Sequence, residues 1–320
     1  MVNQFRNLSV LFVAQVILTF VLFLSDSDTG AYIQNEKLVD LQLDSLDRIV
    51  IEQPEDRPLV LEKQGGNWVL PDYFGFPASV EKITRTFGKL FDTKIGWPVA
   101  TTDAAESRFK VAADQFERKL VFSSANVTEI LYLGTSPGFK KIHARMDGSN
   151  NIYGIMFSAY QAGIKTREWA DQNFLHLPRD QIEGIELGDL VLRRADGKFT
   201  VEGISDAEMV VEAEIANLLA DVSTLGFLEV LGKEDVPSFH LESPEFDFVI
   251  LSKSGERIQY RYGKLDEKDQ YVLKTSNSEY FFKVSKYNLE SLQDVQRAKL
   301  VQEGPVNPVE NSAADPRSTD

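Results

Sequence analysis

The sequence contains no cysteine and has few residues of several other kinds. Without cysteine, the chain has no disulfide, zinc–thiolate site, iron–sulfur cluster, thiol nucleophile or acylated lipoprotein cysteine. Its three histidines, His143, His176 and His240, are far apart in sequence and show no metal-ligand spacing. Basic residues are outnumbered: 34 Lys and Arg against 49 Asp and Glu give a net charge of −15. A surface this acidic repels phosphate backbones, so nucleic acid is not expected as a partner.

Catalytic signatures are also missing from the sequence. No G-x-S-x-G, nucleotide-binding or H-E-x-x-H pattern occurs, and we assign no catalytic residue, no metal ligand and no cofactor. Two carboxylates at a suitable separation can cleave glycosides. However, close acidic pairs such as Glu183 with Glu186, or Glu212 with Glu214, are expected by chance among 49 acidic residues. We interpret them as solvated surface.

The one long hydrophobic run is near the N-terminus. Residues Leu8 to Leu24 carry no charge, and their polar side chains are Ser9, Gln15 and Thr19. A helix of these 17 residues would be about 25 Å long, within the range of membrane-spanning helices. We therefore predict a transmembrane anchor in contact with membrane lipid. Gln15 and Thr19 lie on one helix face and are candidate contacts to a neighbouring membrane helix.

Two other interpretations of this run remain open, a cleaved signal peptide and a buried core helix. A cleavage site needs small residues after the apolar run, and Ser-Asp-Ser-Asp-Thr-Gly-Ala at 25–31 matches poorly, so we favour an uncleaved anchor. Arg6 precedes the run, and the positive-inside tendency then places the N-terminus in the cytoplasm. The expected location is the bacterial inner membrane, single-pass, with most of the chain in the periplasm.

An internal duplication organises the rest of the chain. Trp68 matches Phe199 at an offset of 131, Phe109 matches Phe239 at 130, and Gly134 matches Gly263 at 129. Further matches are Phe116 with Phe246, and Ser158-Ala-Tyr160 with Ser285-Lys-Tyr287. An ordered series with a slowly drifting offset indicates two copies of one module. The predicted organisation is a cytoplasmic stub (1–7), the anchor (8–24), a linker (25–45), two modules (46–180 and 181–300) and a disordered tail (301–320).

Each module is predicted to be α+β, with one main helix packed on an antiparallel sheet. A strand (46–52 or 182–187) leads into a hairpin whose turn contains glycine, at 65–66 or 197. Apolar residues then follow helical spacing and predict the main helix. The two stripes are Val80, Ile83, Phe87 and Leu90, and Val211, Ile215, Leu218, Val222 and Leu225. Ser79 is the expected N-cap of the first helix, and Ser205 with Glu208 the expected capping box of the second.

Aromatic residues are numerous, and comparing the two copies distinguishes those that pack in the core from those that could make surface contacts. Positions that stay aromatic in both copies, such as Trp68, Phe109 and Phe116, are better explained by a shared core than by one ligand site. Trp97 and Trp169 have no clear counterpart, so they are the candidate surface contacts. A packing role near the module junction is equally natural for Trp169.

Two local motifs carry a family resemblance. The first hairpin ends in Gly-Asn-Trp-Val-Leu at 66–70, and residues 77–83 follow the pattern Pro-x-x-Val-x-x-Ile. With the N-terminal anchor and a diverged second copy, they resemble domain-of-unknown-function family 4340 over residues 40–300. The resemblance implies a membrane-anchored bacterial envelope protein associated with ABC transporters of the gliding-motility type. It brings no catalytic residues, and without a lipobox cysteine attachment would depend on the helix itself.

Two functions follow as hypotheses. The first is a non-enzymatic accessory subunit whose partners are the permease and ATPase subunits of an ABC transporter or a gliding-type auxiliary protein. The second is an extracytoplasmic envelope enzyme or polysaccharide-binding module, suggested by the acidic surface and the aromatic residues. The missing catalytic motifs favour the first.

Overall fold

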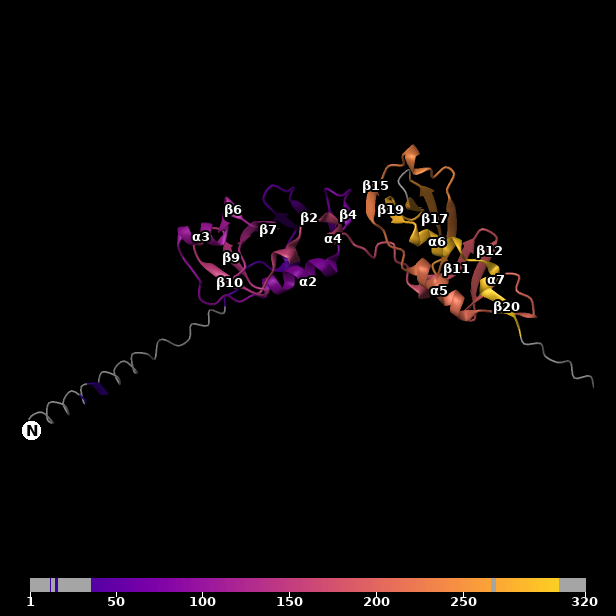
Figure 1. The fold of residues 1–320 in the computed structure, drawn as a ribbon, viewed down its shortest axis with the longest axis horizontal. Helices are drawn as coiled ribbons and strands as arrows, with labels where there is room; N and C mark the ends of the chain where they lie inside the picture. Colours follow the sequence, from indigo (N-terminus) through magenta and orange to yellow (C-terminus); the bar gives the residue numbers. More distant parts are fainter. Residues whose placement is uncertain (1–11, 13–14, 17–35, 266–268, 305–320) are drawn as a thin grey trace, which may run out of the picture. The chain divides into compact units, whose positions relative to one another are not determined.

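The computed structural model describes residues 12, 15–16, 36–265 and 269–304. Contacts within the chain divide it into two compact units. One comprises the described residues of Met1–Leu59 and Ile83–Ile164, and the other comprises Val60–Lys82 and the described residues of Lys165–Asp320. Strands and helices occur in both halves of the sequence (Figure 1), which confirms the predicted α+β class.

The first sheet has eight strands in the order β10-β9-β8-β7-β1-β2-β3-β4, and every pair with a defined register is antiparallel. Its strands are β1 (Arg48–Glu52), β2 (Leu59–Gln64), β3 (Asn67–Leu70), β4 (Phe76–Pro77), β7 (Arg118–Ser124), β8 (Val127–Leu133), β9 (Ile142–Met146) and β10 (Ile152–Ile155). Helix α2 (Val80–Phe91) covers one face. Its Phe87 and Phe91 rings meet Phe122 of β7 edge to face, with ring centroids 5.5 and 5.0 Å apart.

The second sheet also has eight strands, in the order β13-β12-β11-β16-β17-β18-β19-β15. They are β11 (Ile182–Leu187), β12 (Leu190–Ala195), β13 (Lys198–Val201), β15 (Glu229–Gly232), β16 (Phe246–Ser252), β17 (Arg257–Lys264), β18 (Gln270–Thr275) and β19 (Phe281–Ser285). The main helix of this half is α5 (Glu212–Ser223). The other helices are α3 (Asp103–Phe109), α4 (Thr166–Trp169), α6 (Tyr287–Gln293) and α7 (Arg297–Leu300).

The two sheets share one strand order, which is consistent with the predicted duplication. From β3 to β10, the first sheet runs 3-2-1-7-8-9-10, and the second runs 13-12-11-16-17-18-19 through the equivalent segments. The additional strands differ. β4 lies beyond β3 in the first sheet, whereas β15 lies beyond β19 in the second. The segment of the first copy that corresponds to β15 forms only an isolated bridge, from Ala100 to Ile152 of β10.

A close backbone contact recurs at one of the matched glycines in each copy. A Cβ on Gly134 would lie 1.9 Å from the carbonyl oxygen of Phe109, and a Cβ on Gly263 would lie 1.8 Å from that of Phe239. The residues that follow these phenylalanines, Lys110 and His240, both adopt the left-handed conformation. No side chain fits such a contact, so both copies need glycine at this position.

Both predicted hairpins and both main helices are present, with two corrections in detail. Ser79 caps α2 as expected, because its Oγ accepts a hydrogen bond of 3.2 Å from the Lys82 amide. Val80, the first residue of the predicted stripe, is 58% exposed and lies outside the core. Glu208 does pair with Ser205, but the pair closes a turn before β14 (Glu208–Val210) and not the start of α5.

The ends of the described chain are more ordered than the sequence suggests. Within the predicted linker, Leu38 and Val39 are buried. At the start of the predicted disordered tail, β20 (Val301–Glu303) pairs with β14, so the prediction of disorder is wrong for these three residues. Residues 305–320 lie outside the described residues. The boundaries predicted for the two modules stay a prediction.

Candidate interaction sites

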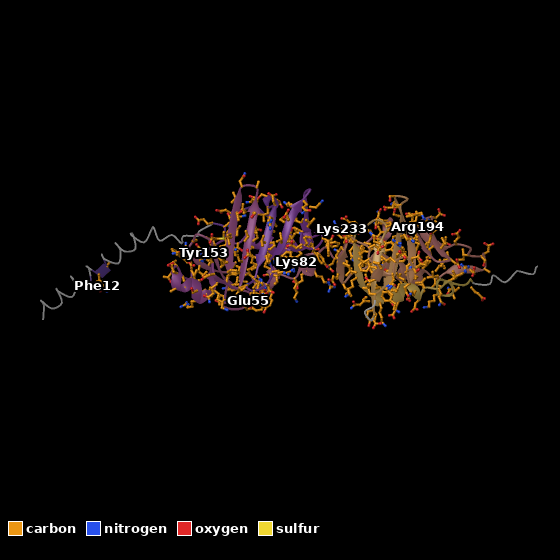
Figure 2. The ribbon with its side chains drawn as sticks, turned by 90° about the horizontal axis from the view of Figure 1, so that it is seen from above. Phe12, Glu55, Lys82, Tyr153, Arg194 and Lys233 are labelled. Atoms are coloured by element: carbon orange, nitrogen blue, oxygen red, sulfur yellow. The ribbon has the colours of Figure 1, made fainter. Side chains whose placement is uncertain are left out.

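The two tryptophans predicted as surface contacts have opposite environments. Trp97 is 79% exposed. Trp169, at the end of α4, is 0% exposed, and its indole lies beneath the Lys82 ammonium, 5.2 Å from the ring centroid. The Ser79 amide donates a 2.7 Å hydrogen bond to the Trp169 carbonyl. Trp169 therefore serves the packing role, and its prediction as a surface contact is wrong. Lys82 is labelled in Figure 2, on the N-terminal, purple part of the ribbon.

The predicted membrane segment is described only in small part. Phe12, Gln15 and Val16 are helical and exposed, whereas Thr19 and the rest of 8–24 lie outside the described residues. In the part of the chain that the structure describes, no helix combines the length and apolarity needed to cross a membrane. The anchor, and the helix contacts of Gln15 and Thr19, stay predictions.

The most exposed aromatic side chain in each copy lies at an equivalent position of the repeat. Tyr160 is 90% exposed and Tyr287 is 76% exposed. We call these residues the paired tyrosines. They come from the matched segments Ser158-Ala-Tyr160 and Ser285-Lys-Tyr287. Core packing explains the other aromatic matches, such as Trp68 with Phe199, which are both buried, but it does not explain this pair.

Both tyrosines lie on a short helical turn, and in each copy the serine two residues before the tyrosine donates a hydrogen bond to the side-chain amide of the residue after it. In the first copy, the Ser158 amide donates a 3.0 Å hydrogen bond to Gln161 Oε1. In the second, the Ser285 hydroxyl donates a 2.8 Å bond to Asn288 Oδ1. The residue that follows Gln161 or Asn288 is buried in both copies: it is Ala162 in the first and Leu289 in the second. Each turn is thus fixed at its start and at its inner face, and the tyrosine between them projects outward.

A second exposed apolar group lies along the β10 edge of the first sheet. We call Trp97, Val99 and Met156 the apolar edge; their side chains are 79%, 54% and 63% exposed. The Val99 amide donates a 2.7 Å bond to the Ile152 carbonyl, and Val99 Cγ1 lies 3.9 Å from the Cβ position of Gly154. These contacts fix the segment against β10. The segment at 97–100 runs antiparallel to β10. Trp97 therefore lies toward the end of β10 that leads to Met156.

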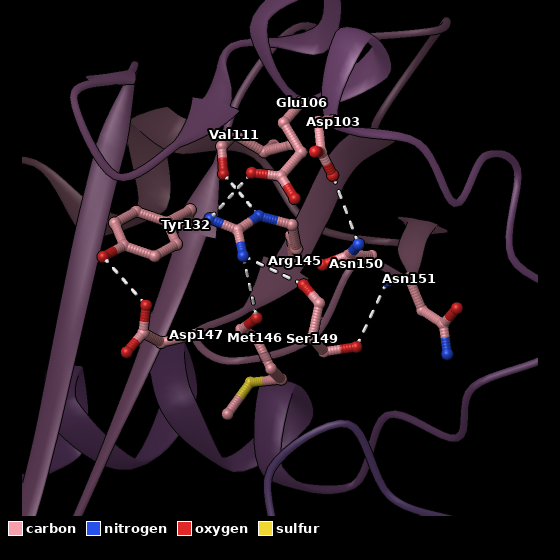
Figure 3. Close-up of polar contacts among 10 residues, drawn as sticks. All are labelled: Asp103, Glu106, Val111, Tyr132, Arg145, Met146, Asp147, Ser149, Asn150 and Asn151. Atoms are coloured by element: carbon pink, nitrogen blue, oxygen red, sulfur yellow. Dashed lines mark hydrogen bonds and ion pairs between the residues drawn. The ribbon is translucent and has the colours of Figure 1, made fainter.

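A buried arginine supports the structure beneath this edge. Arg145, on β9, is 5% exposed. Figure 3 shows its guanidinium at the centre of a polar cluster. It donates hydrogen bonds to the carbonyls of Val111 (2.8 Å), Ser149 (2.9 Å) and Met146 (3.4 Å). It also forms an ion pair with Glu106 of α3 at 3.3 Å and lies 4.9 Å from the centroid of the Tyr132 ring.

This cluster joins three separate segments around one charge. Tyr132 in turn donates to Asp147 Oδ1 at 3.3 Å, and burial, followed by that neighbouring carboxylate, raises the pKa of its phenol. Asn150 donates to Asp103 Oδ1 at 3.2 Å, at the start of α3. A buried charge is tolerated only when it is paired and hydrogen-bonded, and here both conditions are met. The arrangement is that of a structural support, with its charged groups turned to one another.

In the second half, Glu186, which belongs to the close acidic pair Glu183 with Glu186, forms ion pairs with two arginines. Glu186 of β11 accepts bonds from Arg193 (2.6 Å) and from both terminal nitrogens of Arg257 (2.6 and 2.9 Å). Hydrogen bonds from Arg257 and then Arg193 lower the pKa of Glu186 to about 2. The carboxylate is therefore permanently charged near neutral pH and acts as a link between strands.

The three histidines have different environments. His143 is buried, its Nδ1 lies 3.0 Å from Thr135 Oγ1, and burial lowers the pKa of the ring. His176 and His240 are exposed, and His240 Nδ1 lies 2.8 Å from the Lys264 carbonyl oxygen. Over residues 36–265 and 269–304, no three histidine or acidic side chains come close enough together to hold a metal ion.

The described residues of the second half include an open hollow and a smaller one. One, of about 480 Å³, is open and lined by loop residues 235–237 and 240–243. The other is small, about 90 Å³, and includes Thr275, whose buried hydroxyl has no partner, and His176. The lining of the larger hollow includes two acidic residues, Asp235 and Glu242, together with His240, and neither lysine nor arginine.

Comparison with known proteins gives one finding. No curated protein and no solved structure matches the chain significantly. The family model described as a domain of unknown function (DUF4340) matches residues 68–244. This match spans more than half of the 320 residues and extends from the Trp68 hairpin of the first copy past the Phe239 contact of the second. The chain therefore belongs to the DUF4340 family.

Proposed function

We propose that this chain is a non-enzymatic accessory subunit of an ABC-type transporter. In this proposal, Leu8 to Leu24 anchor it in the bacterial inner membrane. The two α+β copies bind the permease, or an associated envelope protein, on the periplasmic side. The ATPase of the complex supplies the energy for transport.

The paired tyrosines carry this proposal. An exposed tyrosine on a fixed turn combines a large apolar ring with a hydroxyl, and tyrosine is enriched in protein–protein interfaces and their energetic hot spots. Tyr160 and Tyr287 are exposed at equivalent positions of two copies, so each copy offers the same contact. Two weak contacts on one chain bind more tightly together than either does alone when both are engaged.

The charged clusters support a binding role over a hydrolytic one. Glu186, a member of one of the acidic pairs, is held in its charged form by two arginines. A general acid needs the opposite, a carboxyl whose pKa is raised so that it keeps its proton. Glu106 is likewise paired with Arg145. These carboxylates stabilise the sheets.

Affinity purification of the full chain from native membranes in mild detergent tests the proposal. We expect a permease and an ATPase to co-purify. The Tyr160→Ala/Tyr287→Ala variant should lose most of them, because hot-spot truncation costs about 2 kcal/mol or more per residue, a factor of about 30. Both side chains are exposed, so the variant should fold normally. Val127→Ala is the control, since Val127 is an exposed apolar residue, at 48%, that lies outside both tyrosine turns.

Two results would contradict the proposal at different points. A chain that always purifies alone would argue against the transporter role. Undiminished co-purification with the double tyrosine variant would leave the role standing but remove the paired tyrosines as its contacts.

A further inference from the structure

The position at which the chain enters the first unit is fixed by backbone hydrogen bonds. The Ile95 amide donates a 3.0 Å bond to the Glu36 carbonyl, and the Leu38 amide donates a 3.0 Å bond to the Thr93 carbonyl. Lys37 and Lys94 thereby form an isolated antiparallel β-bridge through their backbones. Trp97 follows Ile95 by two residues, and consecutive Cα atoms are about 3.8 Å apart. Trp97 therefore lies within about 8 Å, along the chain, of the point where the N-terminal segment joins the fold.

The apolar run of the sequence ends close to that point. Between Leu24 and Glu36 there are eleven residues, 25–35, which span at most about 40 Å when fully extended. If Leu8 to Leu24 cross the bilayer, the segment at 94–99 lies next to residues 36–38, where the first unit is tied to the membrane. Trp97 and Val99 of the apolar edge are on this same segment, and Met156 directly follows β10 beside it.

The chemistry of the edge fits the interfacial zone of a bilayer. Tryptophan is enriched where the hydrocarbon meets the headgroups, because its ring is apolar and its N–H still finds polar partners. Val99 and Met156 add exposed apolar surface next to it. Phe139 and the lysines at 140 and 141 are exposed in the loop that leads into β9, whose first residue, Ile142, pairs with Ile155 at the same end of the sheet. Lysine stems can lie along apolar surface while their charges reach the headgroups.

We infer that the apolar edge, Trp97 with Val99 and Met156, rests on the outer leaflet of the membrane that holds the chain. The inference depends on the anchor of the proposed function. The occupant is the lipid headgroup–acyl boundary, reached by apolar insertion, since the chain as a whole, at −15, is repelled by anionic lipid. The contact orients the first unit at the membrane surface.

Tryptophan fluorescence of the full chain in phosphatidylcholine vesicles tests this contact. The chain has three tryptophans, and Trp68 and Trp169 are both buried in protein. Phospholipids brominated at shallow acyl positions should quench part of the wild-type emission, and Trp97→Phe should abolish the lipid-quenchable part. Val99→Asp should lower it as well. Val127→Asp is the matched control: Val127 has similar exposure, 48% against 54%, but begins β8 at the opposite end of the sheet.

Vesicle flotation separates failure of the contact from failure of the anchor. If the full chain does not float with the vesicles, both the anchor and the inference are wrong. If it floats but Trp97 is quenched by aqueous iodide and not by brominated lipid, the anchor stands and the inference fails. Protection of Trp97 that appears only on adding the transporter subunits, or only with soluble polysaccharide, would also overturn it.

Discussion

Replacement of Arg145 by methionine should strongly destabilise the first unit. Methionine fills the volume of the arginine stem but offers no donor. The change leaves the Val111 and Ser149 carbonyls without their present partner and Glu106, whose side chain is only 16% exposed, without its counter-ion. Breaking one side of a buried ion pair typically costs about 3–5 kcal/mol. We expect a loss of about 3 kcal/mol, since water can reach part of the Glu106 carboxylate.

The second copy provides the control for this prediction. Lys274 occupies the equivalent place on β18: it pairs with Phe281 and Arg261, as Arg145 pairs with Ile152 and Tyr132. Burial, with a further contribution from Arg261, lowers the pKa of Lys274. Its ammonium donates to the Ser278 carbonyl and lies over the Phe281 ring. Lys274→Met therefore removes one hydrogen bond together with an unfavourable charge and should cost about 1 kcal/mol or less.

Hydrogen exchange of the full chain, followed by peptide in mild detergent, measures both effects locally. Arg145→Met should lower the opening free energy of β9 and α3, and a further Glu106→Leu change should restore about 1 kcal/mol or more by removing the orphaned carboxylate. If Arg145→Met costs no more than Lys274→Met, or if the second change brings no recovery, the cluster is not a support and the reasoning fails.

Three further predictions concern other parts of the fold. Gly134→Ala and Gly263→Ala should each abolish native exchange protection in their own sheet, because the new Cβ would overlap a backbone carbonyl, whereas Gly154→Ala, with its nearest neighbour at 3.9 Å, should leave β10 protected. Glu186, whose folded pKa is about 2, should stabilise the second sheet above pH 4.5 and lose that effect as the pH falls toward 2. The amplitude should be about 1 kcal/mol because Arg257 is mostly exposed, and Glu186→Gln should flatten this limb of an acid-unfolding curve. Phe76→Ala should cost about 3–5 kcal/mol, measured by urea unfolding, because this fully buried ring contacts the rings of Phe174, Phe227, Tyr280 and Phe282.

The sequence correctly predicts the elements whose pattern lies within a few neighbouring residues, the hairpin turns and the main helices. The Gly-Gly turn at 65–66 and the Asp-Gly turn at 196–197 all have positive φ, as the hairpins require. The stripes from Ile83 to Leu90 and from Ile215 to Leu225 are buried. The sequence shows the match of Gly134 with Gly263 as a repeat, but the reason for it, the contact with a matched phenylalanine carbonyl, exists only in the folded chain.

The missed features depend on contacts between distant segments. β9 reads Ile-His-Ala-Arg-Met, which alternates apolar and polar residues as a half-exposed strand would, but His143 and Arg145 are buried as well. Nothing in the sequence marks Arg145 as buried, because its partners come from α3 and from residues 111 and 149. Trp169 is covered by the chain around Ser79 and Lys82, some ninety residues away. Ser205 and Glu208 do have the right spacing for a capping box, but β14 pairs with β20 and delays the helix to Glu212.

The duplication also acts as an internal comparison of which features each copy needs. The framework is kept: the strand order, the glycine contact and the buried residue that closes each tyrosine turn occur twice. The polar interior is not kept, since the place of Arg145, which pairs with Glu106 in one copy, is taken in the other by Lys274, which bonds a backbone carbonyl. A fold can lose a buried ion pair when other residues fill its volume and satisfy the polar groups around it. The exposed tyrosine recurs although the support does not, and packing gives no reason for it, so the surface at Tyr160 and Tyr287 is the feature that a shared partner would explain.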